Sequence, residues 1–206
     1  MDTGISSEDA LRRLKAGNER FLQGGYSLTA LDLEKMRGDL VSGQHPFAVV
    51  IACSDSRVPP SLIFDQDLGD LFVIRVAGNV VGPSQVASVE YAVDVLRSSL
   101  VVVVGHTGCG AIGAAVKAIL NPDVHYSPSM DMLMGRISEA VHDDGAFAEA
   151  PSLEEKCEIA GQANVRHALE NLVNLSDIIR DAEAAGAVKL VGAQYDMASG
   201  VVHWMD

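Results

Sequence analysis

Short apolar runs alternate along the chain with longer segments in which apolar residues recur every three or four positions. An apolar run of about six residues that is rich in β-branched types and bounded by turn-forming residues is typical of a strand buried on both faces. The runs predict five strands, at residues 47–52, 71–76, 100–105, 188–195 and 201–204. Because the last run follows a polar turn, we expect it to form an antiparallel edge strand.

The segments between the strands predict helices, because their apolar residues share one face at helical spacing. A first helix is expected to begin at Ser6 or Ser7, which can cap it, and to end at Gly24. The other helices are expected at residues 31–41, 60–64, 83–97, 111–120, 130–141, 151–173 and 176–185. This alternation of strands and helices predicts a doubly wound, mostly parallel α/β sheet with right-handed crossovers.

A strand order of 2-1-3-4-5 would place the first and third strands side by side, with the chain leaving them in opposite directions. Ligands of open α/β sheets bind beyond the carboxyl ends of the strands at such a switch point. The length of 206 residues predicts one domain with a substantial core. We expect a helical arm at residues 1–42 followed by an α/β core at residues 43–206.

Charge and cysteine content narrow the class of protein. The formal net charge is −13 and the isoelectric point is near 4.7, which argues against nucleic acid or an anionic membrane surface as a partner. The N-terminus has no basic segment followed by an apolar one, and no run approaches the roughly 18 apolar residues of a membrane span. Three cysteines are too few and too uneven for a disulfide framework. We therefore expect a soluble, cytoplasmic protein.

The first strand runs directly into Cys53, Asp55 and Arg57. A thiol, a carboxylate and a guanidinium at the carboxyl end of a buried strand indicate a catalytic or binding site rather than residues that only pack in the core. The alternative is a buried thiol beside a surface ion pair. The third strand runs into His106 and Cys109, which a tight, glycine-rich turn brings together.

Cys53, His106 and Cys109 supply three of the four ligands that zinc takes in proteins, and Asp55 could supply the fourth. Two adjacent parallel strands would bring both turns to one point, so the two motifs together are a stronger signal than either alone. A disulfide between Cys53 and Cys109, or a redox role for them, is the competing interpretation. Arg57 can hold Asp55 through two parallel hydrogen bonds, and Asp55 can then accept a hydrogen bond from a zinc-bound hydroxide.

Residues 53–57 (CSDSR) together with residues 105–110 (GHTGCG) resemble the β-class carbonic anhydrases, and the resemblance extends over nearly the whole chain. It implies a zinc enzyme that hydrates carbon dioxide reversibly to bicarbonate and a proton through zinc-bound hydroxide. It also implies a closed state in which Asp55 leaves Arg57 and becomes the fourth zinc ligand. Alternative functions are hydrolysis of carbonyl sulfide or carbon disulfide on the same scaffold, or zinc binding without catalysis.

The resemblance further implies a substrate pocket formed by Gln44, Phe72, Tyr91 and the backbone N–H of Gly110. Core packing is the alternative for Phe72 and Tyr91. Sites of this family are built between subunits, so the resemblance implies a homodimer or homotetramer in which the N-terminal arm packs on a neighbouring subunit.

The branch of the family with strong bicarbonate allostery carries a tryptophan where this chain has Val50, although Arg75 and Tyr195 match that branch's other pocket residues. Gln44 matches the plant-like branch instead. We therefore expect an open resting site, with Asp55 off the zinc at neutral pH.

Overall fold

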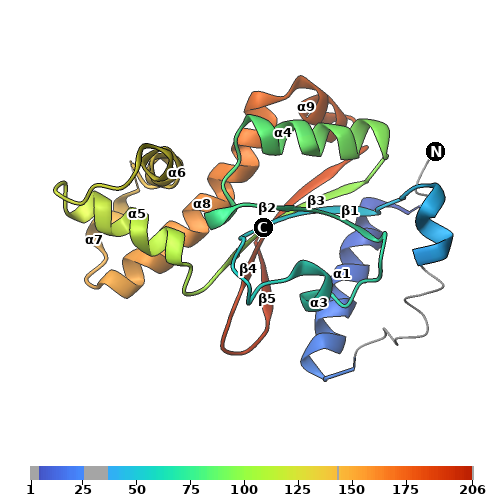
Figure 1. Cartoon of the computed structure of the whole chain (residues 1–206), viewed down its shortest axis with the longest axis horizontal. Helices are drawn as coiled ribbons and strands as arrows, with labels where there is room; N and C mark the ends of the chain where they lie inside the picture. Colours follow the sequence, from blue (N-terminus) through green and yellow to red (C-terminus); the bar gives the residue numbers. More distant parts are fainter. Residues whose placement is uncertain (1–4, 26–36, 143, 206) are drawn as a thin grey trace.

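The computed structural model describes residues 5–25, 37–142 and 144–205. Its centre is a five-stranded sheet in the order β2-β1-β3-β4-β5, which confirms the predicted order (Figure 1). The first four strands are mutually parallel and β5 is antiparallel to β4. The strands are β1 (Ala48–Ala52), β2 (Leu71–Arg75), β3 (Leu100–His106), β4 (Lys189–Tyr195) and β5 (Val202–Met205).

The two faces of the sheet carry separate apolar clusters. One cluster joins the sheet to the first helices, α1 (Ser7–Leu22) and α3 (Pro60–Ile63), and extends to α5 (Gly110–Leu120), α6 (Pro128–Glu139) and α7 (Gly145–Glu149). The other joins the sheet to α4 (Pro83–Glu90), α9 (Asp177–Ala184) and part of the long helix α8 (Leu153–Leu175), as Figure 1 shows. Among the described residues, each helix falls short of the length or apolarity that a membrane span requires.

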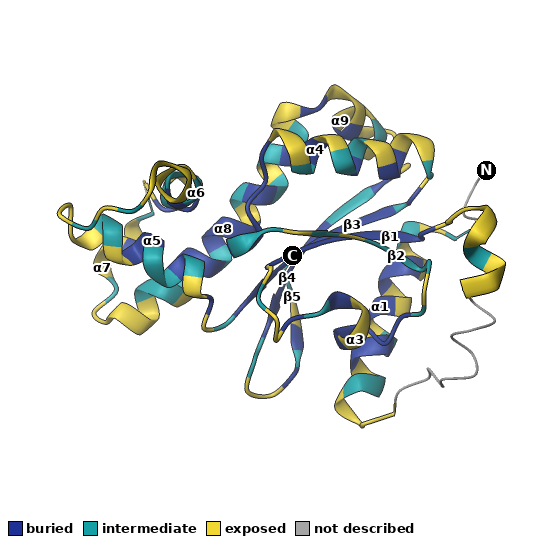
Figure 2. Ribbon diagram, in the orientation of Figure 1, coloured by how far each residue is buried: buried dark blue, intermediate teal, exposed yellow. Residues whose placement is uncertain are grey.

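The burial of the strands follows their position in the sheet. Every residue of β1 and β3 is buried, as their continuous apolar runs predict, whereas the edge strand β2 mixes half-buried and exposed residues (Figure 2). Parallel strands inside such a sheet are covered by helices on both faces, which explains why alternation is absent from their sequences.

Three short segments differ from the regular pattern. The helix predicted at residues 83–97 changes type in its second half, because α4 ends at Glu90 and a π-helical segment, Tyr91–Val95, follows. Short 3-10 turns occupy Leu40–Ser42 and Ala77–Asn79. Most of the helix predicted at residues 31–41 lies outside the described residues.

Helix α1 is packed onto its own chain. The Asn18 side chain donates hydrogen bonds to the carbonyls of Ile63 and Gly200 at 3.2 and 3.0 Å, and accepts one from the N–H of Val202 at 3.0 Å. Gly17 lies so close to the Phe64 carbonyl that an added Cβ would be 1.7 Å from its oxygen. Helix α1 is therefore part of the fold of this chain, and packing of the arm on a neighbouring subunit stays a prediction.

Candidate metal centre

The Cys53 turn follows β1 and carries the first candidate ligand. Cys53 is 5% exposed, and its Sγ accepts hydrogen bonds from the backbone N–H groups of Gly78 and Asp55 at 3.3 and 3.4 Å. Gly78 belongs to the turn after β2, which neighbours β1 in the sheet. Two N–H donors aimed at one sulfur stabilise the thiolate, the form that binds metals.

The His106 turn follows β3 and carries the other two candidates. His106 is 3% exposed, and its Nδ1 lies 2.9 Å from the carbonyl oxygen of Thr107. Because a carbonyl only accepts hydrogen bonds, Nδ1 carries the proton and the lone pair is on Nε2. Gly108 adopts a φ of 64°, and Cys109 then caps α5.

Cys53, His106 and Cys109 form one buried cluster whose ligand atoms all lie within 4.8 Å of one another. The two sulfurs are 3.9 Å apart. Two sulfurs on one tetrahedral zinc, each about 2.3 Å from the ion, are separated by about 3.8 Å. Nε2 of His106 is buried and has no hydrogen-bond partner among the described residues. The spacing and the orphaned imidazole nitrogen both fit a zinc ion held by these three residues, as predicted.

The two thiols influence each other strongly. The hydrogen bond from the Cys109 thiol lowers the pKa of Cys53 to about 3, and the same bond together with burial raises the pKa of Cys109. Both cysteines are free, and their sulfurs lie far beyond the roughly 2.05 Å of a disulfide bond. The predicted alternative of a disulfide between them is therefore absent from this structure.

Asp55 and Arg57 form the predicted clamp beside the cluster. Arg57 Nε and Nη2 donate to the two carboxylate oxygens of Asp55 at 2.9 and 2.7 Å, and the Arg57 backbone N–H donates to Oδ1 at 2.9 Å. These bonds hold the pKa of the Asp55 carboxyl well below its usual range. Arg57 Nη2 also approaches the carbonyl of Gly108 at 3.5 Å, so the clamp reaches across to the His106 turn.

Arg75, which matched a pocket residue of the branch with bicarbonate allostery, contacts the Cys53 turn in this structure. Its Nε donates to the Cys53 carbonyl at 2.9 Å, and its Nη2 donates to the Asp55 carbonyl. Arg75 pairs in register with Ala52, so the last residue of β2 lies beside the end of β1. A cation at the end of a strand parallel to the ligand strand is the signal that could have identified it.

The predicted pocket residues divide into two groups. Gly110 begins α5 directly after Cys109 and lies at the cluster. Gln44 precedes β1, whose five residues span about 16 Å, so it lies at the opposite end of that strand from Cys53. Phe72 and Tyr91 contact each other with ring centroids 6.2 Å apart. Phe72 packs against the apolar cluster on the sheet face opposite to the one that contains Cys53.

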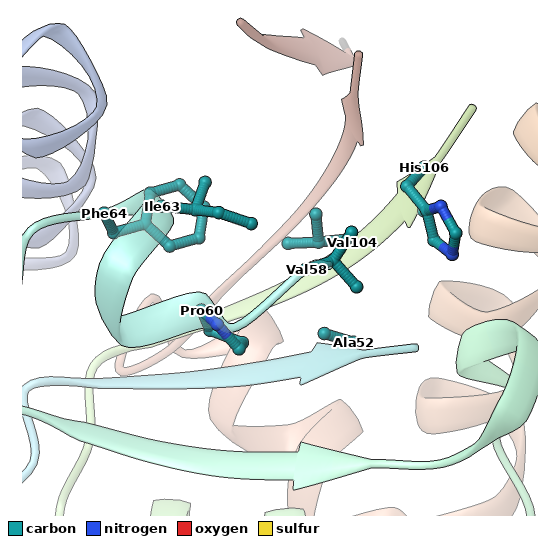
Figure 3. Close-up of a pocket in the computed structure, with 8 residues that line it drawn as sticks. Ala52, Val58, Pro60, Ile63, Phe64, Val104 and His106 are labelled. Atoms are coloured by element: carbon teal, nitrogen blue, oxygen red, sulfur yellow. The ribbon is translucent and has the colours of Figure 1, made fainter. Parts of the chain in front are cut away.

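Two hollows adjoin the candidate ligands. A small apolar cavity of about 10 Å³ lies between α3 and the ends of β1 and β3, with His106 at one side (Figure 3). It has room for about one water molecule and offers that water no polar partner from its apolar lining. An open groove of about 600 Å³ runs past His106 and Cys109 toward Lys117 and Gln194. The groove gives the ligand turn contact with solvent.

Comparison with known proteins gives one consistent result. The family model described as carbonic anhydrase matches residues 48–202. Carbonic anhydrase 2 of Mycobacterium tuberculosis is 36% identical over 93% of this chain and 89% of its own length. A carbonic anhydrase of Mycolicibacterium smegmatis is also 36% identical, over 94% and 90% of the two chains. The crystal structure of the β-carbonic anhydrase CafA of Aspergillus fumigatus superposes with a TM-score of 0.77 at 27% identity, covering 96% of this chain and 91% of that one.

Proposed function

This chain belongs to the β class of the carbonic anhydrase family, and from that membership we propose how its residues carry out the reaction. The reaction is the zinc-dependent, reversible hydration of carbon dioxide to bicarbonate and a proton. Cys53, His106 and Cys109 hold the zinc. The observation that carries this function is the buried cluster of these three ligands, with an ionised carboxylate clamped beside it.

When bound, zinc lowers the pKa of water toward neutrality and so supplies a nucleophile at physiological pH. Asp55 orients the attacking water in our proposal. An ionised carboxylate only accepts hydrogen bonds, so it fixes the direction of the water's O–H and leaves a lone pair of the water oxygen free for the carbon of the substrate.

Arg57 keeps Asp55 in this role. Its three hydrogen bonds to the carboxylate engage both Asp55 oxygens and leave Asp55 outside the ligand cluster. We propose that this is the resting state at neutral pH, with an open site of the plant-like kind. Arg75, at the end of β2, donates hydrogen bonds to the carbonyls of Cys53 and Asp55. These bonds support the same arrangement, because they fix the backbone of the turn that carries Asp55.

The substrate pocket is completed by a second copy of the chain. We propose that the backbone N–H of Gly110, which begins α5, donates to an oxygen of the forming bicarbonate. Gln44 precedes β1 and Phe72 pairs with Val49 near the start of β1, so both lie away from Cys53, and Tyr91 contacts Phe72. We propose that these three residues serve the site of a neighbouring subunit.

The edge of the sheet supports a homodimer at least. Val73, Tyr91 and Val95 are 37%, 48% and 56% exposed, and β2 pairs with β1 alone among the described strands. Val73 lies on the edge strand β2, whereas Tyr91 and Val95 lie in the π-helical segment. Exposed large apolar side chains and a sheet edge with a free side both favour association. A tetramer is the larger alternative, and tetrameric β-carbonic anhydrases of Sordaria macrospora share the fold with a TM-score of 0.76 at 26% identity.

We also propose a cytoplasmic location. The sulfurs of Cys53 and Cys109 are only 3.9 Å apart, and both must stay reduced to bind zinc. A reducing compartment protects such a pair from oxidation to a disulfide.

Stopped-flow hydration of carbon dioxide by the zinc-loaded protein tests the proposed function. We expect rapid turnover that disappears when a chelator removes the zinc and returns when zinc is added back. Absence of hydration at every pH from about 6.5 to 9, with one zinc bound per chain, would transfer the assignment to hydrolysis of carbonyl sulfide or carbon disulfide, or to zinc binding without catalysis.

The variant Asp55→Asn tests the role of the carboxylate separately from the zinc site. We expect it to retain zinc and to lose turnover by about 10²-fold or more, because an amide can present an N–H to the water and misdirect it. Asp123→Asn, an exposed loop change away from the site, is the matched control. Equal activity in both variants would remove Asp55 from the mechanism.

A further inference from the structure

Gly78 stands between the Cys53 sulfur and a residue on a distant helix. Its backbone N–H donates to Cys53 Sγ at 3.3 Å, and its φ of 68° lies in the left-handed region. An added Cβ would lie 3.0 Å from Ile137 Cδ1 and 3.2 Å from Ala111 Cβ. Helices α6 and α5 therefore confine the residue whose N–H reaches the sulfur.

Asn164 holds the other side of Gly78. It lies on α8 and is 1% exposed, and its Nδ2 donates a hydrogen bond to the Gly78 carbonyl oxygen at 2.7 Å (Asn164 and Gly78 are 86 residues apart). The buried face of α8 is otherwise made largely of small and aliphatic residues. A buried amide costs free energy unless its hydrogen bonds are made, so an asparagine at this position is explained by the bond to Gly78.

The carbonyl and the N–H of Gly78 are fixed together. With its φ and ψ confined by the packing, holding the carbonyl oxygen also fixes the direction in which the N–H points. The side chain of Asn164 thus sets an N–H···S bond that it does not itself make.

An N–H···S bond draws electron density away from a thiolate ligand and so adjusts how strongly that ligand donates to its metal. We infer that Asn164 is a positioning residue of the metal centre, which tunes the Cys53 sulfur through the backbone of Gly78. The inference rests on the proposed zinc site and goes beyond it, because Asn164 touches neither ligand nor substrate.

The test replaces Asn164 by leucine and measures the metal centre itself. With Co²⁺ in place of zinc, we expect the sulfur-to-cobalt charge-transfer band of Asn164→Leu to move to longer wavelength, because a thiolate that loses a hydrogen bond is easier to oxidise. We also expect zinc to bind about tenfold more weakly and therefore to pass to a chelator faster, because the donor on the Cys53 sulfur is no longer held in place; this is the lower end of the 10–100-fold loss of affinity typical of outer-sphere partners. Asn164→Asp provides a second variant of the same size that cannot donate when ionised.

Ala168→Gly is the matched control for stability. Ala168 is buried on the same helix at 1% exposure, and glycine there loosens α8 without touching the Gly78 bond. A charge-transfer band and a release rate that stay at wild-type values in both Asn164 variants would overturn the inference. Equal shifts in Ala168→Gly would overturn it too. Failure of the wild-type protein to bind one zinc or cobalt would instead overturn the proposed function.

Discussion

The two turns that carry the candidate metal ligands differ in how far along the chain the partners of their ligand side chains lie. The ligand side chains of the His106 turn have their partners in nearby chain: Thr107 provides the acceptor for the imidazole, and backbone N–H groups in the first turn of α5, at Ala111 and Ile112, act on the Cys109 sulfur. The Cys53 turn draws its second sulfur donor from Gly78, which is 25 residues further along, and Gly78 is held from α8.

This difference shows that the source of the hydrogen-bond donors to a ligand depends on the structure that follows the ligand in the chain. A helix that begins at a ligand brings its own N–H donors, because the first turn of any helix leaves them unpaired. A ligand on a turn without a following helix needs donors from elsewhere in the fold. The second arrangement makes the Cys53 half of the centre sensitive to changes in remote elements.

A pair of glycine substitutions gives the largest expected contrast between the turns. Gly78 and Gly108 have similar φ values, 68° and 64°, but an added Cβ is crowded at Gly78 and meets nothing within 4 Å at Gly108. Gly108→Ala should lower the free energy of unfolding by about 1–2 kcal/mol, the cost of a left-handed backbone. Gly78→Ala should lose the same amount and about 1–3 kcal/mol more of unfolding free energy, because the added methyl group overpacks its surroundings. We also expect this variant to release zinc faster.

Chemical denaturation of the two zinc-loaded variants, followed by transfer of zinc to a chelator, measures both effects. The contrast requires that zinc release accelerates more in Gly78→Ala than in Gly108→Ala. Equal losses of stability and equal release rates would mean that the surroundings of Gly78 yield easily, and the two turns would then be equivalent.

Thr107→Val probes the support of the His106 turn, with a smaller expected effect. The Thr107 hydroxyl accepts a hydrogen bond from the N–H of Met197 at 2.9 Å, whereas the bond to the imidazole uses the backbone carbonyl. Removing the hydroxyl should cost about 1 kcal/mol of unfolding free energy. Zinc release should stay close to the wild-type rate, because the Thr107 N–H still binds the Tyr195 carbonyl at 3.0 Å.

Thr107→Ser keeps the hydroxyl and serves as the control for Thr107→Val. A large acceleration of zinc release in the valine variant alone would show that the His106 turn depends on distant contacts as much as the Cys53 turn does.

Sequence reasoning identified what is carried by local pattern. The strands, the three candidate ligands and the clamp of Asp55 by Arg57 all follow from runs and spacings of a few residues. The end of α4 at Glu90 could not be read in this way, because apolar residues continue at helical spacing into the π-helical segment Tyr91–Val95. The position of Gln44, in contrast, could have been predicted from the sequence. The nine residues from Gln44 to Cys53 include an extended strand, so the two residues must lie at opposite ends of it.

The hydrogen bonds made by residues far away in the sequence could not be predicted for a different reason. The bond from Asn164 to Gly78 depends on where α8 crosses the turn after β2, and the bonds from Arg75 depend on the register of β2 against β1. A sequence pattern predicts that these elements exist, but it does not fix their crossing or register to the few tenths of an ångström that a hydrogen bond requires.

The turn between β4 and β5 gives the smallest expected effect and a test by pH. Asp196 Oδ1 accepts hydrogen bonds from the hydroxyl and N–H of Ser199 and from the N–H of Ala198, and the Ser199 hydroxyl is the main cause that lowers the pKa of Asp196. A carboxyl whose pKa is lower in the folded than in the unfolded state stabilises the fold above the unfolded value of about 3.9 and loses that contribution as the pH falls through the folded value.

The same turn carries Met197, which supports Thr107 of the His106 turn. The difference in urea midpoint between the wild type and Asp196→Asn should therefore be constant from pH 8 to about pH 5 and should shrink below it. A difference that persists unchanged at about pH 3.5 would show that the charge of Asp196 contributes nothing to the stability of this turn.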